Sequence, residues 1–187
     1  MKTVYGFLST LVLCCIFFSF TTPTTSTADR PIPLVERVVL DGKLTIKVPE
    51  GFRLMTAEEI EARYPSGNRP ALVYTDESLS VNIAINHTQN PAAADQLPEF
   101  LSAFEGQFEQ SGMVEKWIRK DMVKVKGQDA VQLEMMTKAP NTEIYNMVTG
   151  TVLEERLLLV SFNCVERLKD IWRPVAVQVS ESITTKK

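Results

Sequence analysis

Two side chains of this sequence could form a nucleophile and its base, namely Cys164 and His87. His87 is the only histidine of the chain. A reactive thiol needs a base within hydrogen-bond distance and a third group that orients the base. One interpretation is therefore a thiol or hydrolytic enzyme built on this pair. We favour the other, in which Cys164 is a buried structural residue and His87 is a capped histidine at the rim of a sheet, because free cysteine is among the most buried residue types.

A second group of side chains could bind a ligand without reacting with it. Apolar and polar residues alternate along 79–88, which predicts a strand with Leu79 and Val81 on its apolar side. Similar polar residues lie in 143–153 and 156–165, which also predict strands. The predicted polar face comprises Ser80, Asn82, Asn86, Asn146 and Asn163, with Thr88 and Ser161 beside them. Neutral amides and hydroxyls suit sugars or peptides better than ions. The alternative is an ordinary solvated sheet face.

Basic residues are concentrated in the segment 116–126. They are Lys116, Arg119, Lys120, Lys124 and Lys126. We expect this segment to be an edge strand whose outward lysines prevent edge-to-edge aggregation. Lys124 and Lys126 are expected to pair with Glu134 across a hairpin. A site for an anionic partner is the alternative.

The motifs of metal and phosphate chemistry are missing from the sequence. A lone imidazole does not make a usual zinc site, and there is no Gly-rich phosphate loop, nucleophile elbow or calcium loop. We therefore expect no cofactor, no metal and no enzymatic activity. The net charge of −3 also argues against nucleic acid as a partner.

The N-terminal 28 residues predict a secretory signal peptide. Lys2 gives a positive start, residues 4–20 carry no charge, and the small residues Ser26 and Ala28 suit cleavage before Asp29. An uncleaved anchor is the alternative, although the apolar run is shorter than the ~20 residues of a usual span. Lipidation at Cys14 or Cys15 is disfavoured, since no small residue precedes either. We expect an exported protein of the periplasm or cell envelope.

The rest of the chain has the composition of one globular domain. Residues 29–187 carry 19 basic and 23 acidic side chains, and Cys164 is their only cysteine, so no internal disulfide is possible. The patterning predicts the order β-β-α-β-β-α-β-β-β-β-α, an α+β fold with an antiparallel sheet and about three helices packed on it. Expected strands are 37–40, 44–48, 71–74, 79–88, 117–126, 130–138, 143–153 and 156–165, with helices from 56, over 97–108 and over 170–183.

Several details of these elements follow from single residues. Thr56 and Glu59 form a capping box. Asp95 is the expected N-cap and Gly112 the expected C-cap of the middle helix. In the last helix, Ile171 is expected on the buried stripe and Pro174 in or near the first turn. The segment 156–162 is apolar on both faces, which predicts a central strand.

The order of elements, together with three local patterns, resembles the PsbP-like superfamily. The patterns are the strand and turn at 44–52, the Gly-centred hairpin at 123–131, and the closing strand and helix at 157–162 and 172–183. That superfamily includes PsbP subunits of photosystem II, Ran-binding Mog proteins and DcrB-type bacterial envelope proteins. The resemblance covers about 36–184 and implies their fold, but its functions diverge. No photosystem or Ran-binding residues match, and the signal peptide argues against a Ran partner.

The expected organisation is a signal peptide at 1–28, a lead-in at 29–35, a PsbP-like domain at 36–184 and a frayed end at 185–187. The expected function is a non-enzymatic binding or assembly module of the cell envelope. Its partner would be an envelope protein or a small neutral ligand, and it would meet a membrane only through an uncleaved or lipidated N-terminus. As an assembly subunit it would use its edge strand or the surface of the 97–108 helix.

Overall fold

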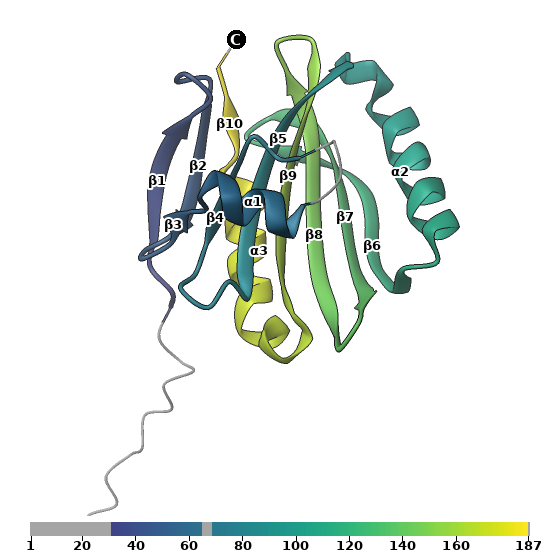
Figure 1. Ribbon diagram of the computed structural model, residues 1–187. Coiled ribbons are helices and arrows are strands. Elements are labelled where there is room, and N and C mark those ends of the chain that lie inside the picture. Colours follow the sequence, from purple (N-terminus) through teal and green to yellow (C-terminus); the bar gives the residue numbers. More distant parts are fainter. Residues whose placement is uncertain (1–30, 65–68, 187) are drawn as a thin grey trace, which may run out of the picture. The chain divides into compact units, whose positions relative to one another are not determined.

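The structure is a computed structural model that describes residues 31–64 and 69–186. The predicted signal peptide lies outside the described residues. The elements follow the predicted order with four short ones added (Figure 1). The strands are β1 (Leu34–Val39), β2 (Leu44–Pro49), β3 (Arg53–Leu54), β4 (Leu72–Thr75), β5 (Val81–Pro91), β6 (Val114–Val125), β7 (Gln128–Ala139), β8 (Thr142–Leu153), β9 (Arg156–Val165) and β10 (Thr184–Thr185). The helices are α1 (Ala57–Arg63), α2 (Leu97–Ser111) and α3 (Lys169–Ser182), with short 3-10 helices η2 (Ala94–Gln96) and η3 (Glu166–Leu168).

The strands form two antiparallel sheets. The large sheet has seven strands in the order β3-β4-β5-β9-β8-β7-β6, and the small sheet has three in the order β1-β2-β10. The apolar strand β9 is the middle strand of the large sheet, as predicted. The α+β class with three helices is confirmed, and the division into two sheets is the new feature. A turn at Gly51, whose φ is +84°, separates the first hairpin from the strands of the large sheet.

The C-terminal end is paired with the small sheet, although the sequence predicted that it would fray. Thr184 and Thr185 pair with Thr45 and Leu44 of β2. The Lys186 amide donates to the carbonyl of Lys43, 2.8 Å away. These bonds join segments that are far apart in the chain, so the local composition near the end does not reveal them.

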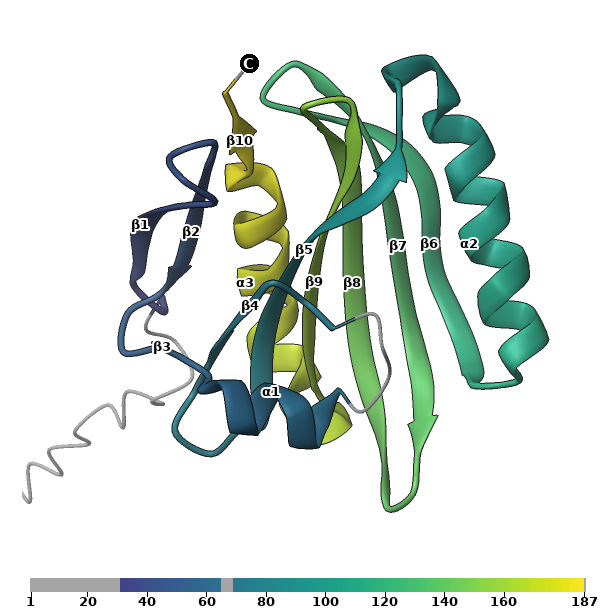
Figure 2. The ribbon, with the colours of Figure 1, turned by 45° about the horizontal axis from the view of Figure 1, so that its top comes forward.

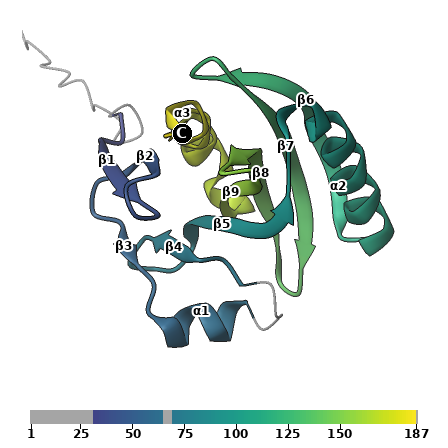
Figure 3. The same ribbon diagram turned by 90° about the horizontal axis from the view of Figure 1, so that it is seen from above.

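Helix α3 lies between the two sheets, and the main hydrophobic core surrounds it (Figure 3). The helix contributes Val175, Ala176 and Val179, all of which are buried. Phe162 of β9 and Ile46 of β2 face it from the two sheets and are buried as well. Because apolar residues of both sheets converge on this helix, the core joins the small sheet to the large one.

The other face of the large sheet carries α1 and α2 (Figure 2). Leu97, Phe100 and Phe104 of α2 pack with Val131 of β7 and Leu157 of β9 in a second cluster. Their helical spacing is the one that the sequence predicts. Met55, Val73 and Ala84 form a third cluster beneath α1. The two helices cover different parts of this face, so a strip of sheet lies between them.

The capping predictions hold at two helix ends and fail at a third. The capping box of Thr56 and Glu59 starts α1, and Gly112, at φ +64°, ends α2. Asp95 does not cap α2. The chain first forms the 3-10 helix η2, in which the Gln96 side chain accepts a hydrogen bond from the Ala93 amide at 2.9 Å.

Two predictions for the last helix are wrong. Ile171 is 52% exposed, because the buried stripe is centred on Trp172, Ala176 and Val179, and Ile171 lies roughly a third of a turn away from it. Pro174 lies beyond the first turn of α3, inside the helix. Its missing amide leaves the carbonyl of Asp170 without its usual helical donor.

Candidate functional site

The strand register separates the predicted nucleophile from the predicted base. Cys164 pairs with Val81 of β5, whereas His87 pairs with Leu158, six residues further along the same strand. At about 3.3 Å per residue the two side chains are roughly 20 Å apart. Proton transfer between them would need about 3 Å. The alternative of a thiol or hydrolytic enzyme using Cys164 and His87 is therefore wrong.

Cys164 is a core residue, 1% exposed. Burial raises the pKa of its thiol to about 12, and the charge of Lys169 only partly opposes this rise. Because the thiolate is the reactive form, we expect native Cys164 at pH 8 to react with iodoacetamide at least about 100-fold more slowly than in denaturant. Mass spectrometry of the peptide that contains Cys164 measures this rate separately from those of Cys14 and Cys15. A native rate within about tenfold of the denatured rate would contradict the protonated, buried thiol.

His87 is held by hydrogen bonds at the end of the sheet. Its Nε2 lies 2.8 Å from the carbonyl oxygen of Leu153, and its Nδ1 lies 3.3 Å from Nη2 of Arg156. Since Arg156 can only donate, Nδ1 accepts and Nε2 carries the proton that is donated to Leu153. Both ring nitrogens therefore have structural partners, as predicted for a capped histidine.

Three of the predicted polar residues form one row across the large sheet. Asn82 of β5 pairs with Asn163 of β9, and Asn163 pairs with Asn146 of β8. Nδ2 of Asn82 donates to Oδ1 of Asn163 at 3.2 Å, and the hydroxyl of Thr75 donates to Oδ1 of Asn82 at 2.8 Å. Asn82 is fully buried, whereas Asn146 and Asn163 are half-buried. The buried Asn82 therefore holds the Asn163 side chain in place, and Asn163 and Asn146 are partly exposed at the surface of the sheet.

Ser80 lies apart from this row. It precedes β5, and its carbonyl accepts a hydrogen bond from the Val165 amide at 3.3 Å. Its neighbour Leu79 was expected on the same side as Val81. Leu79 instead has a φ of +58° and packs with Met55 beneath α1. The positive φ turns the chain just before the strand, so the strict alternation begins only at Val81.

Asn86 lies in a groove between α2 and the large sheet. The groove consists of two hollows of about 610 and 220 Å³, which share Phe104, Gln107 and Leu159 in their linings. We call it the α2 groove. Its polar end is lined by Arg69, Ala71, Asn86, His87, Thr88, Gln89 and Asn90, and its apolar end by Phe108, Ser111, Met113, Val148 and Ser161.

The α2 groove presents neutral hydrogen-bonding groups next to apolar surface. Among the described residues that line it, the one permanently charged side chain is Arg69, and its guanidinium is paired with Glu61 at 3.1 Å. The amides of Asn86, Asn90 and Gln107 can each donate and accept. A neutral ligand with its own donors and acceptors fits this lining better than an ion does.

Helix α2 is fixed to the edge strand β6 by contacts that include Phe108 of the groove lining. Lys120 of β6 forms an ion pair with Glu105 of α2. The Lys120 ammonium also lies over the ring of Trp117, 5.1 Å from its centre. Trp117 and Phe108 meet edge to face with their ring centres 6.2 Å apart. The groove thus has one wall that several contacts hold in place.

The basic segment forms the edge strand β6, as predicted, but its charge pairs differ from the prediction. Lys124 pairs with Asp129 at 2.7 Å. Lys126 lies in the turn before β7 with a φ of +49°. Neither pairs with Glu134, because the carboxylate of Glu134 points to the opposite face of the sheet, toward α3.

Glu134 belongs to a buried polar cluster that the sequence patterns did not predict. Glu134 is 1% exposed. Nε of Arg173 on α3 donates to its Oε1 at 2.5 Å, Nη2 donates to its Oε2 at 3.2 Å, and the hydroxyl of Tyr145 donates to Oε1 at 2.8 Å. Burial and the neighbouring carboxylate raise the pKa of Tyr145. One feature of the sequence could have indicated this cluster. The carboxylate of Glu134 lies between the apolar residues Leu133 and Met135 of a predicted strand, where a buried polar side chain needs partners.

The described part of the chain holds no group of three histidine, cysteine, aspartate or glutamate side chains placed for a metal ion. Within residues 31–64 and 69–186, no helix has both the length and the apolar character of a membrane span.

Neither a family model nor a curated protein sequence matches the chain. Among solved structures, it is similar to cyanobacterial PsbP (CyanoP) from Synechocystis sp. PCC 6803, with a TM-score of 0.60 and 14% identity over 87% of this chain and 98% of that one. The chain has a PsbP-like fold. The Ran-binding protein Mog1p of Saccharomyces cerevisiae is also similar, with a TM-score of 0.53 and 13% identity over 83% of this chain and 96% of that one.

These likenesses confirm the predicted resemblance at the level of the fold. The similarity to both structures extends over more than four fifths of this chain. Identities of 13–14% carry no residue roles from one chain to the other. The function of the α2 groove must therefore be argued from its own residues.

Proposed function

We propose that this chain is a non-enzymatic binding module of the cell envelope, and that its α2 groove takes a neutral, partly apolar segment of a partner protein. The observation that carries this proposal is the lining of the groove, which combines aromatic and aliphatic side chains with the neutral amides of Asn86, Asn90 and Gln107, whose side chains have no hydrogen-bond partner among the described residues. Peptide groups donate and accept hydrogen bonds as those amides do.

The two ends of the groove favour a polypeptide over a sugar. At the apolar end, Phe108, Met113 and Val148 offer a place for an apolar side chain, which a sugar lacks. At the polar end, Asn86 and Gln107 offer partners for main-chain amides. At the apolar end, Val148 of β8 and Leu159 of β9 lie in strands that are paired on both sides, so the partner would be held there by side chains and not by adding a strand.

The remaining residues of the predicted polar face have secondary roles in this proposal. Asn146 and Asn163 extend the neutral surface from the groove toward α1. Asn82 fixes the Asn163 amide from below through its hydrogen bond. Ser80 lies at the far end, outside the groove lining. The fold is compatible with such a role, since Mog1p is a Ran-binding protein, although Ran itself is not the partner that we propose.

Charge introduced into the α2 groove should weaken binding. We expect Gln107→Glu and Asn86→Asp each to lower affinity at least about tenfold, because each carboxylate would lose water on binding and the one arginine of the lining, Arg69, is already paired with Glu61. The probe is a neutral peptide selected against the purified chain from a displayed library of short peptides. Affinity is measured by fluorescence anisotropy for the wild type and for each variant.

Two substitutions provide matched controls. Gln110→Glu makes the same change on α2, and Asn141→Asp makes it in the β7–β8 turn. Both positions are exposed and lie outside the groove lining. The controls should bind as the wild type does. The proposal fails if the library yields only charged peptides or none, or if the control pair weakens binding as much as the groove pair.

Export is a separate part of the proposal and has its own test. The charged start, the apolar run and the small residues before Asp29 support cleavage after Ala28. We expect N-terminal sequencing of the protein recovered from the cell envelope to begin at Asp29. A chain that begins at Met1, or a blocked terminus at Cys14 or Cys15, would mean that an anchor or a lipid holds the domain at the membrane.

A further inference from the structure

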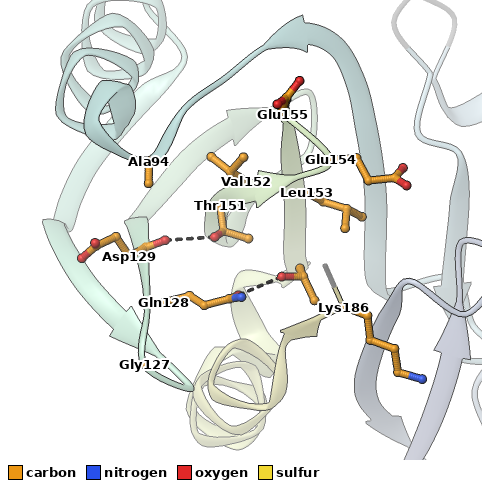
Figure 4. Close-up of a pocket in the computed structure, with 11 residues that line it drawn as sticks. Ala94, Gly127, Gln128, Asp129, Thr151, Val152, Leu153, Glu154, Glu155 and Lys186 are labelled. Atoms are coloured by element: carbon orange, nitrogen blue, oxygen red, sulfur yellow. Dashed lines mark hydrogen bonds between the residues drawn. The ribbon is translucent and has the colours of Figure 1, made fainter.

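A cavity of about 740 Å³ lies at the end of the large sheet where several chain segments meet (Figure 4). It is bounded by the β6–β7 turn, the β8–β9 turn, η2 and β10. Its lining is Ala94, Gly127, Gln128, Asp129, Thr151, Val152, Leu153, Glu154, Glu155, Thr185 and Lys186. None of these residues lines the α2 groove. The volume lies within the roughly 300–1,000 Å³ of typical small-molecule sites.

The charged groups of the lining point away from the middle of the cavity. Figure 4 shows the carboxylates of Asp129, Glu154 and Glu155 directed outward. Two of them have partners there. Asp129 pairs with Lys124 at 2.7 Å, and Glu154 pairs with Lys43 at 2.9 Å. The interior is therefore not a site for an ion, although its rim carries charges of both signs.

The interior itself is apolar with a few neutral polar groups. Val152 and Leu153 are consecutive residues of β8, so they face opposite sides of the sheet. Leu153 is buried in the core around α3, and Val152 is half-buried on the α2 side, where it contributes apolar surface to the lining. The Thr151 hydroxyl is occupied, since it donates to the carbonyl of Asp129 at 2.9 Å. Oε1 of Gln128 accepts from the Thr185 hydroxyl at 2.8 Å. Gln128 lines the cavity, and its amide nitrogen has no acceptor among the described residues.

We propose that this cavity binds a small neutral molecule with an apolar body and one hydrogen-bond acceptor. The apolar body would cover the apolar residues of the lining that are not fully buried, Ala94 and Val152, and the acceptor would take the hydrogen bond that the Gln128 amide can still donate. A charged head group would have to be desolvated inside without a partner, which is unfavourable. The cavity is independent of the α2 groove, so either site can bind while the other fails.

Three probes with one carbon chain and different head groups test the ligand class. They are hexanamide, hexanoate and hexylammonium, each titrated into the purified chain with binding followed by amide chemical shifts. We expect saturable shifts at Gln128, Leu153 and Thr185 with hexanamide, and binding of both charged probes at least about tenfold weaker. Tighter binding of either charged probe would overturn the assignment to a neutral ligand.

Two substitutions test the place of binding. Ala94→Trp fills the rim of the cavity, and Ala103→Trp makes the same change at an exposed position of α2 outside every hollow described above. Hexanamide binding should be lost in the first variant and unchanged in the second. Gln128→Glu keeps the acceptor for Thr185 and removes the free donor, and it should weaken hexanamide binding about fivefold. Absence of saturable binding to the wild type, or unchanged binding to Ala94→Trp, would overturn the proposal.

Discussion

Replacing Arg173 with methionine is expected to lower the free energy of unfolding by about 3 kcal/mol. The guanidinium of Arg173 makes two hydrogen bonds to the carboxylate of Glu134, which is 1% exposed. The Arg173 side chain is half exposed, so losing its own charge costs little. The effect comes from Glu134, which keeps a buried negative charge with the Tyr145 hydroxyl as its one side-chain partner among the described residues. Urea denaturation followed by circular dichroism measures the change.

Two further variants separate this cause from a general effect on α3. Arg167→Met makes the same substitution at an exposed arginine just before the helix and should change stability by less than about 0.5 kcal/mol. Adding Glu134→Gln to Arg173→Met removes the stranded charge and leaves an acceptor for Tyr145, so it should recover most of the loss. A double variant as unstable as Arg173→Met alone would show that the loss comes from packing of the arginine and not from the unpaired carboxylate.

Gly150→Ala is expected to destabilise the protein by about 1–3 kcal/mol. A Cβ atom at Gly150 would lie 2.7 Å from Cγ2 of Val131 and 3.2 Å from Cδ2 of Leu159. Val131 is fully buried and branched at Cβ, so it has little freedom to move aside. The clash lies in the cluster beneath α2, and a shift there should also change the α2 groove. Thermal unfolding of the variant measures the loss.

Gly106→Ala provides the opposite expectation for the same substitution. Gly106 lies inside α2, and a Cβ atom there would meet nothing within 4 Å. Because glycine is a poor helix former, this variant should gain about 0.5–1 kcal/mol. If both variants lost stability by similar amounts, crowding beneath α2 would not be the reason for the effect at Gly150.

Most of the elements could be predicted from local patterns. The alternation in 79–88, the helical spacing of Leu97, Phe100 and Phe104, and the capping box at Thr56 each depend on a few neighbouring residues. The two sheets and the pairing of β10 could not be predicted in this way. They depend on contacts between distant segments, such as Thr185 with Leu44.

The candidate site was only partly predictable for the same reason. The alternating pattern assigns Asn82, Asn163 and Asn146 to three strands, but only the register shows that they lie side by side. It also shows that Cys164 and His87 are far apart. The α2 groove and the cavity at the end of the large sheet lie between segments that are far apart in the sequence. A local sequence pattern cannot predict such a space.

The most direct test of the proposed function is site-specific photo-crosslinking in intact cells. A photoreactive phenylalanine analogue replaces Gln107 in the α2 groove, and in a second strain it replaces Gln110 on the same helix outside the groove. We expect one defined crosslinked envelope protein from position 107 and none from position 110, with the crosslink mapped to a neutral, partly apolar segment of that protein. Equal crosslinking from both positions, or none from position 107, would show that the α2 groove is not the binding site.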